Sequence, residues 1–561
     1  MLSANQISAT PFQKIALSMS GGGYRAASFH LGSLAYLNHL TYQNKPLLEQ
    51  VSMISTVSGG TITGIVYALG QQNGQSFDQI FDYLMKTLQQ VDLVKEGLTQ
   101  LNPDAVWDNK TKRKNLINAF ANLYDKHFTK GATLGMLEAE GHLEHIVFNS
   151  TEFNHAVNFR FRNRQAGYSG NHYMRYNTPL TNEIKLSDVM AASSCFPGGF
   201  EPLLWPHDFV HEAAPALAAL AKANLPVGIM DGGIYDNQGI DSILNYKDDS
   251  KKPPYFDLVI ISDVASPDMA PFKPFQENPK KGLFTKTIGE IRDDIGRFII
   301  QSTWALLLLI LLFALLPACW NYTNSIASGI MLAIAGVMLL LLIGKLWLVA
   351  EAKKVYEEKA AWFRATYKGF YLDKISALDF NSISLHRAQP LIMDRINSLA
   401  TLLMDVFLKV VRRLNYNRLY QDDRYQYRRI SNLIKELISE DSPGIKQSKT
   451  KATENTPTAA NELENIAPET IGRVAGRAAA FGTTLWFTEE ENDADLLNDL
   501  VATGQFTMCY NLLQYLERIT TDSGSGFAEL PPEAQKALQE TRAECQRHWE
   551  QFTANPYYLI D

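Results

Sequence analysis

Short apolar runs alternate with segments of helical periodicity over the first 265 residues. The run KIALSMS (14–20) ends in glycines and is followed by YRAASFHLGSLAYLNHL, in which apolar residues recur at helical spacing. The run VSMISTV (51–57) repeats this order of strand, glycine-rich turn and helix. A third run, FDLVIISDV (256–264), is continuously apolar, as parallel strands buried on both faces require. The alternation predicts an α/β fold with a mainly parallel sheet and helices on both sides.

One segment departs from this pattern. Between Phe298 and Ala350 lie two apolar stretches, each close to the roughly 20 residues needed to cross a bilayer core, joined by the uncharged turn NYTNS. Tryptophans stand near their ends, where aromatic belts occur. A buried hairpin of a soluble protein is the alternative, but core helices carry a polar face and these stretches do not. We expect an inserted transmembrane helical hairpin over 298–350.

Basic residues flank this hairpin on both sides. Arg292 and Arg297 precede it, and Lys353 and Lys354 follow it. By the positive-inside rule, both large soluble parts and both termini are expected in the cytoplasm, which makes the protein a multi-pass membrane protein with two helices. The N-terminus lacks a charged region followed by an apolar one, so no secretory signal is expected.

The chain after the hairpin is expected to be helical in two parts. Residues 351–440 predict a mainly helical region, and residues 471–561 predict a C-terminal helical part. Residues 441–470 are polar, rich in Ser, Thr, Asn and Pro, and free of aromatic residues, which is typical of a flexible linker.

Charge and cysteine content exclude some classes of function. The net charge of −7 gives no reason to expect nucleic acid as a partner. The four cysteines show no CxxC or Cys/His spacing: Cys195, Cys319, Cys509 and Cys545. We therefore expect reduced thiols and no zinc site. A serine–aspartate pair of the kind considered below needs no metal, and no cofactor is expected.

The segment SGGGYRAA (20–27) follows the first strand. Its consecutive glycines expose backbone N–H groups at a helix N-terminus, where an anion or the oxyanion of an acyl-transfer intermediate binds. A dinucleotide loop is the alternative. In the frame that starts at Gly21, however, Ala26 stands in place of the third glycine, and Glu49 precedes the second strand instead of ending it.

The segment TVSGG (56–60) follows the second strand. A serine on a sharp strand-to-helix turn is a nucleophile elbow, whose usual form is G-x-S-x-G. Gly60 fits this form, and Thr56 stands where the first glycine belongs. The alternative is a loop serine near a helix start. Two glycine-rich turns about forty residues apart favour Ser58 as a nucleophile beside an oxyanion hole.

A serine nucleophile needs a base. Among the histidines, none stands in an obvious strand-end motif: His30 and His39 lie on the first helix, and His207 and His211 flank an alanine-rich stretch. Asp231 ends an apolar strand and precedes two glycines. A carboxylate in a dry site is a stronger base than a solvated one. A simple turn aspartate is the alternative.

Four motifs in this order resemble the patatin-like phospholipases, whose core is shared with cytosolic phospholipase A2: SGGGYRA, TVSGG, AASSCFPGGFEP (191–202) and DGGIYDNQG (231–239). The resemblance implies a three-layer patatin-like core over 12–266, to which the C-terminal helical part adds late pieces of the same domain. It also implies a catalytic dyad of Ser58 as nucleophile and Asp231 as general base.

The resemblance further implies an oxyanion hole made by the N–H groups of Gly21, Gly22, Gly23 and Gly59. Arg25 matches a basic residue that, in the phospholipase A2 relatives, helps to hold the lipid phosphate; an ion pair that locks the loop is the alternative. The arginine-rich segment 407–429 is either a contact for anionic headgroups or a solvated helix face.

These features together predict a membrane-anchored lipid acyl hydrolase of the phospholipase A or lysophospholipase type. Its partners would be a phospholipid membrane and a lipid substrate, with no nucleic acid and with protein partners unknown. A general carboxylesterase or acyltransferase would use the same dyad. A non-catalytic membrane scaffold is the remaining alternative, although both Ser58 and Asp231 are present.

Overall fold

The computed structural model describes residues 6–560 with gaps at 108–109, 139–140, 164–166, 248–252, 266–271, 276–284, 320–324, 367–381 and 439–467. The chain divides into two compact units. The first unit comprises Met1–Ala270 and Leu402–Asp561, and the second comprises Pro271–Thr401.

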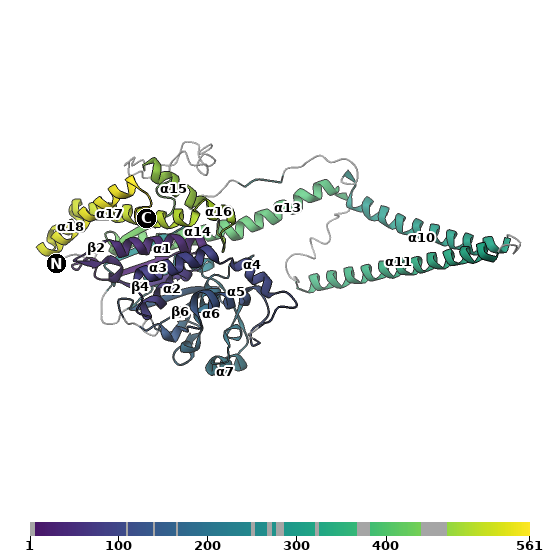
Figure 1. Ribbon diagram of the computed structural model, residues 1–561, viewed down its shortest axis with the longest axis horizontal. Coiled ribbons are helices and arrows are strands. Elements are labelled where there is room, and N and C mark those ends of the chain that lie inside the picture. The colour runs from purple at the N-terminus through teal and green to yellow at the C-terminus, as the bar shows by residue number, and fades with distance from the viewer. Residues whose placement is uncertain are drawn as a thin grey trace. The chain divides into compact units, whose positions relative to one another are not determined.

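A ten-stranded sheet forms the centre of the first unit (Figure 1). Its strands are β1 (Ile15–Met19), β4 (Val51–Val57), β5 (His145–Glu152), β6 (Val157–Arg162), β7 (Ser169–Gly170), β8 (Arg175–Tyr176), β9 (Leu203–Trp205), β10 (Val227–Asp231), β11 (Leu258–Asp263) and β12 (Arg429–Leu433). The strands β12, β11, β1, β4 and β5 are parallel neighbours in that order. Beyond them, β6 to β8 and β9 to β10 pair antiparallel. The parallel centre confirms the prediction from the alternating pattern, and the antiparallel strands beyond it make the sheet mixed.

Helices cover the sheet and complete the first unit. They are α1 (Gly23–His39), α2 (Gly59–Gln72), α3 (Phe77–Gln90), α4 (Leu93–Gln100), α5 (Leu116–Tyr124), α6 (Leu186–Ser193), α7 (Pro215–Ala223), α8 (Gly233–Asp236), α9 (Ile240–Leu244), α14 (Phe407–Tyr420), α15 (Glu469–Ala480), α16 (Glu489–Asp493), α17 (Leu496–Thr521) and α18 (Pro532–Ala554). A small hairpin of β2 (Thr41–Tyr42) and β3 (Lys45–Pro46) follows α1.

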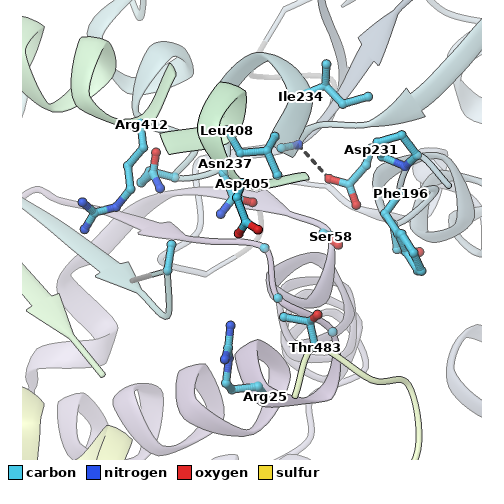
Figure 2. Close-up of a pocket in the computed structure, with 18 of the residues that line it drawn as sticks. Arg25, Ser58, Phe196, Asp231, Ile234, Asn237, Asp405, Leu408, Arg412 and Thr483 are labelled. Atoms are coloured by element: carbon cyan, nitrogen blue, oxygen red, sulfur yellow. Dashed lines mark hydrogen bonds between the residues drawn. The ribbon is translucent and has the colours of Figure 1, made fainter. Parts of the chain in front are cut away.

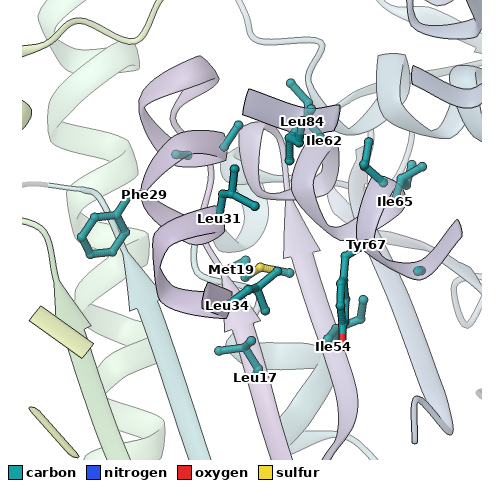
Figure 3. Close-up of a cluster of buried hydrophobic side chains, with 14 of the residues drawn as sticks. Leu17, Met19, Phe29, Leu31, Leu34, Ile54, Ile62, Ile65, Tyr67 and Leu84 are labelled. Atoms are coloured by element: carbon teal, nitrogen blue, oxygen red, sulfur yellow. The ribbon is translucent and has the colours of Figure 1, made fainter. Parts of the chain in front are cut away.

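The parallel strands are buried on both faces because two hydrophobic cores sandwich them. Leu17 and Ile54 pack with Leu34 of α1 in the larger core (Figure 3). Val259 and Ile261 of β11 face the other core, where α9 and α14 contribute. Alternate strand residues thus enter opposite cores, as the two-residue period of a strand requires. The resulting helix–sheet–helix layers confirm the predicted three-layer fold.

Strand β12 lies within the range 351–440 that was expected to be mainly helical. Its five residues pair with β11 at the end of the parallel set. The sequence RISNL is too short and too polar to stand out as a strand, and only the exposed edge of β11 gives it a partner. The predicted linker 441–470 lies outside the described residues, except for 468–470, and α15 begins at Glu469.

The second unit contains α10 (Ile288–Cys319), α11 (Ser325–Thr366) and α13 (Leu385–Thr401). The segments Ile288–Ala318 and Ile326–Trp362 each contain an apolar window of 18 residues, with mean hydropathies of 2.5 and 2.7. The buried share of this window is 0% in the first segment and 11% in the second. A helix of a soluble core would be mostly buried. These two helices are therefore long and apolar enough to cross a membrane. The predicted range 298–350 covers their apolar parts, and each helix continues into a polar extension.

Candidate active site

Ser58 occupies a strained turn between β4 and α2. Its φ is 52° and its ψ is −120°, a combination that side-chain-bearing residues rarely adopt. The glycines that follow permit the turn: a Cβ on Gly59 would lie 2.0 Å from the carbonyl oxygen of Gly23, and one on Gly60 would lie 2.4 Å from that of Met19. The turn has the strand–turn–helix form of a nucleophile elbow and presents the serine at a helix N-terminus.

The register of the sheet brings Ser58 close to Asp231. On β5, Val57 of β4 pairs with Asn149, and Asp231 of β10 pairs with the next residue, Ser150. Because β6 occupies the opposite edge of β5, β4 and β10 approach along the same edge from opposite directions. The end of each strand therefore lies at the same level of the sheet. Figure 2 shows the Asp231 carboxylate directed toward Ser58.

Asp231 is buried in the structure, and its surroundings make it a stronger base than a solvated carboxylate. Burial raises the pKa of Asp231 to about 6, while hydrogen bonds from the N–H of Gly233 and from the Ser58 side chain oppose that rise. The Gly233 N–H lies 2.7 Å from Oδ1, and this bond is drawn in Figure 2. The strand is also fixed by Thr151, whose hydroxyl donates to the Asp231 carbonyl at 2.8 Å. The buried carboxylate thus lies next to the hydroxyl that it would deprotonate.

Ser193, at the end of α6, fixes the turn that carries Ser58 through two hydrogen bonds. Its Oγ accepts a hydrogen bond from the Ser58 N–H at 2.9 Å and donates one to the Asn149 carbonyl at 2.7 Å. The next turn of the chain holds the base, because the Cys195 carbonyl accepts from the Asp231 N–H at 2.9 Å. One short segment therefore positions both candidate catalytic residues.

The glycine loop before α1 contributes amides at the N-terminus of that helix. Gly23 has a φ of 59°, and a Cβ there would lie 2.3 Å from the Thr484 carbonyl oxygen. The expectation for Gly21 is wrong, because its N–H donates to the Asn237 carbonyl at 3.0 Å and is not available to an oxyanion. The first amides of a helix have no intrahelical acceptor, which leaves Gly22, Gly23 and Gly59 as candidate donors.

Arg25 lines the same cavity from the first turn of α1. Its Nη1 donates to the Phe481 carbonyl at 2.9 Å, and its buried Nε has no hydrogen-bond partner in the described part of the chain. Burial lowers the pKa of Arg25, and the nearby Asp263 carboxylate opposes that shift. The contact that Arg25 makes with the neighbouring chain is therefore a hydrogen bond to a carbonyl, and not the ion pair that was one of its two expected roles.

A cavity of about 340 Å³ connects these groups. Ser58 and Asp231 line it together with further polar residues, among them Asn237, Asp405 and Lys409, and with apolar side chains. Apolar or aliphatic wall residues come from distant parts of the chain: Phe196, Pro197, Ile234, Ala265, Leu408 and Leu485. Such a cavity fits an acyl chain next to a reacting ester.

The histidines weighed as bases lie elsewhere. No histidine is among the described residues that line the cavity. His30 is buried below the glycine loop, where its ring nitrogens contact the Ser262 Oγ and the Ser20 carbonyl, each at 2.9 Å. Burial lowers the pKa of His30 to about 4, so it is a neutral structural residue.

A family model described as Patatin-like phospholipase matches residues 17–244. Residues 17–244 are therefore similar to the patatin-like phospholipases. This match supports a lipid acyl hydrolase, and it confirms the resemblance drawn from the four motifs. No curated protein matches the chain.

Solved structures of human GIVD cytosolic phospholipase A2 are similar to the chain. One is 13% identical, covers 46% of this chain and 44% of that chain, and has a TM-score of 0.33. Another, in complex with methyl gamma-linolenyl fluorophosphonate, is 15% identical, covers 47% of this chain and 42% of that chain, and has a TM-score of 0.27. The chain thus spans less than half the length of these solved chains.

Helix α14, which was expected only as part of a helical region, contributes residues to the cavity. Arg412 lines the cavity and is buried, with its Nε 2.9 Å from Asp263 Oδ2. Arg418 pairs with Asp241, which is also buried. These two arginines of the segment 407–429 therefore pair with buried carboxylates, while 46% of the Arg418 side chain stays exposed.

Among the described residues of the chain, no group of three or more His, Cys, Asp or Glu side chains is arranged to hold a metal ion.

Proposed function

We propose that the protein is a membrane-anchored lipid acyl hydrolase that cleaves the fatty-acyl esters of phospholipids or lysophospholipids through a Ser58–Asp231 dyad. The observation that carries this proposal is the placement of Ser58, at a strained turn, beside the buried carboxylate of Asp231, whose pKa is raised by burial, in one shared cavity. The patatin-like phospholipase match supports the lipid substrate class.

Acylation begins with the Ser58 hydroxyl. Its proton passes to Asp231 as Oγ bonds the ester carbonyl carbon, and the carbonyl oxygen becomes an oxyanion. The amides of Gly22, Gly23 and Gly59 would stabilise that charge. The C–O bond to the glycerol oxygen then breaks, and this oxygen takes the proton back from Asp231. An acyl-serine and a lysolipid result.

Deacylation repeats these steps with water. Asp231 accepts a proton from a water molecule whose oxygen attacks the acyl carbon. The bond to Ser58 Oγ breaks, the serine recovers its proton from Asp231, and the fatty acid leaves. Arg25 faces the same cavity and would contact the lipid phosphate.

The hairpin of α10 and α11 would hold the enzyme at its substrate. Its helices are 32 and 42 residues long, or about 48 and 63 Å at 1.5 Å per residue, and their central parts are apolar and largely exposed. Exposed apolar helices of this length are stable in a bilayer and not in water. The flanking basic residues would face the cytoplasm, together with the patatin-like domain.

Release of fatty acid from mixed phospholipid vesicles by the purified full-length protein tests this function. We expect free fatty acid and lysolipid in equal amounts at early times. Transfer of the acyl group to an added alcohol, without free fatty acid, would indicate an acyltransferase. No product, together with no labelling of Ser58 by a serine-directed phosphonate, would favour the scaffold alternative.

The pH dependence of this activity follows from Asp231. Because the base must be deprotonated and its pKa is about 6, kcat/KM should be nearly constant above about pH 7. Below about pH 6 it should fall by about tenfold per pH unit. A pH–rate profile on neutral, uncharged ester substrates measures this dependence. An inflection near pH 4, typical of a solvated carboxylate, would contradict the buried base.

A further inference from the structure

Lys345 is a charged residue within the apolar part of α11. Its Nζ reaches across to α10, where it lies 2.9 Å from the Ile299 carbonyl oxygen, 2.5 Å from Ser302 Oγ and 3.0 Å from Thr303 Oγ1. The two helices lie alongside each other in the second unit (Figure 1). Lys345 therefore joins them at one level of the hairpin.

All three partners of Lys345 are neutral. The Thr303 hydroxyl donates to the Ile299 carbonyl at 2.7 Å, and the Ser302 hydroxyl donates to backbone carbonyls of its own helix. The lone pairs of both hydroxyl oxygens are thus left for the ammonium. Among the described residues no carboxylate lies within 4.0 Å of Lys345 Nζ, so its hydrogen bonds are satisfied and its charge is not balanced. An ammonium whose charge is not balanced can take up an anionic partner in a charge-assisted hydrogen bond.

The level of Lys345 is that of an aromatic belt. Trp304 follows Thr303 directly, and Trp347 lies two residues after Lys345; their exposed fractions are 63% and 66%. Exposed tryptophans on membrane helices lie at the headgroup level. Arg297 and Lys353 belong to the same end of the hairpin. Lipid phosphates would therefore surround Lys345 in the membrane.

We propose that Lys345, Ser302 and Thr303 form a binding site for the phosphate of an anionic phospholipid; this inference rests on the proposed membrane placement of the hairpin. A phosphate oxygen replaces one neutral acceptor of the ammonium and supplies the missing negative charge in a charge-assisted hydrogen bond. The two hydroxyls can rotate to donate to the other phosphate oxygens.

The surroundings of the site favour a lipid over a free phosphate ion. Leu341 and Leu348 stand four residues before and three residues after Lys345, on the same side of α11, and their exposed fractions are 61% and 63%. Acyl chains attached to the bound phosphate would lie against these leucines. A free phosphate ion would gain nothing from this apolar surface.

Lipid retention by the purified full-length protein tests the site. The protein is transferred from mixed micelles of phosphatidylcholine and phosphatidylglycerol, and bound lipids are counted by native mass spectrometry. The wild type should retain phosphatidylglycerol over phosphatidylcholine by at least about fivefold, the effect of one well-placed cation. Lys345→Gln, which keeps an N–H donor for α10 but removes the charge, should abolish this preference.

Two matched variants complete the test. Lys345→Arg keeps the charge and should keep the preference, and Lys354→Gln removes a flanking charge and should also keep it. A preference retained in Lys345→Gln, or lost equally in Lys354→Gln, would overturn the proposal. Loss of bound phosphatidylglycerol in millimolar inorganic phosphate would show that the site binds the free ion and would overturn the lipid assignment.

A separate measurement distinguishes this proposal from the proposed function. Alkaline extraction of membranes shows whether the hairpin is inserted, and fatty-acid release shows whether the dyad is active. We expect Lys345→Gln to remain in the membrane and to hydrolyse lipid. If the wild type itself is extracted, the membrane anchoring fails and the lipid site fails with it, whereas an inactive but inserted enzyme overturns only the hydrolase.

Discussion

Replacement of Ser58 by alanine is expected to lower fatty-acid release by at least about 10³-fold, because the attacking oxygen is removed while the binding cavity and the amide donors remain. The substitution keeps the Cβ that packs against Gly21, so the fold should persist. Release from phospholipid vesicles by the full-length variant measures the loss, and its circular dichroism and thermal midpoint verify the fold.

Ser28→Ala is a matched control for this loss. Ser28 is a buried serine of α1 whose hydroxyl donates to the Tyr24 carbonyl at 2.8 Å, within its own helix. Its removal should leave the rate within about tenfold of the wild type, because it costs only a local hydrogen bond. If Ser58→Ala retained as much activity as Ser28→Ala, the nucleophile would have to be another residue.

The structure of the turn around Ser58 shows why TVSGG forms an elbow although Thr56 replaces the first glycine of the usual motif. Thr56 occupies the place of the first glycine, but it is still part of β4, and its Oγ1 lies 2.8 Å from Thr61 Oγ1. A side chain there is accommodated and partnered. Gly60 differs, since any Cβ would clash with the Met19 carbonyl oxygen. The glycine that the geometry requires is therefore the one that the sequence retains.

The core elements could be predicted because their signals are local. Apolar runs followed by glycines and helical periodicity identified β1, β4 and the helices after them, and a strand end followed by two glycines identified Asp231. Antiparallel entry of β10 beside β4 was not predictable in this way. It depends on β5, because β4 and β10 both pair with the same edge of that strand. No local sequence pattern indicates either pairing.

The remaining wall of the cavity could not be predicted for the same reason. Leu408 and Arg412 are separated from Ser58 by more than 300 residues, and a helical pattern does not say which face of α14 meets which strand. The basic residues of α14 suggested a face that contacts solvent or lipid headgroups. In the structure, Arg412 instead forms an ion pair with the buried Asp263. Ser193 belongs to the motif AASSCFPGGFEP, but the sequence does not indicate its contact with the Ser58 N–H, because that contact depends on the folded geometry.

Asp231→Asn is expected to reduce hydrolysis by at least about 10³-fold while leaving the cavity intact. Asparagine is nearly the same size as aspartate, and its Oδ1 can still accept the hydrogen bond from the Gly233 N–H. It cannot take the proton of Ser58, so the hydroxyl stays a weak nucleophile. Fatty-acid release and the rate at which a phosphonate probe labels Ser58 should fall together.

Asp236→Asn separates the loss of a base from the loss of a buried carboxylate. Asp236 is also buried, and burial raises its pKa to about 7, but it accepts hydrogen bonds from the backbone N–H groups of Gln238 and Asp241 and does not line the cavity. Its replacement should lower stability more than the rate of hydrolysis. Only the carboxylate that meets the serine can act as its base, so equal losses of activity in the two variants would contradict the dyad.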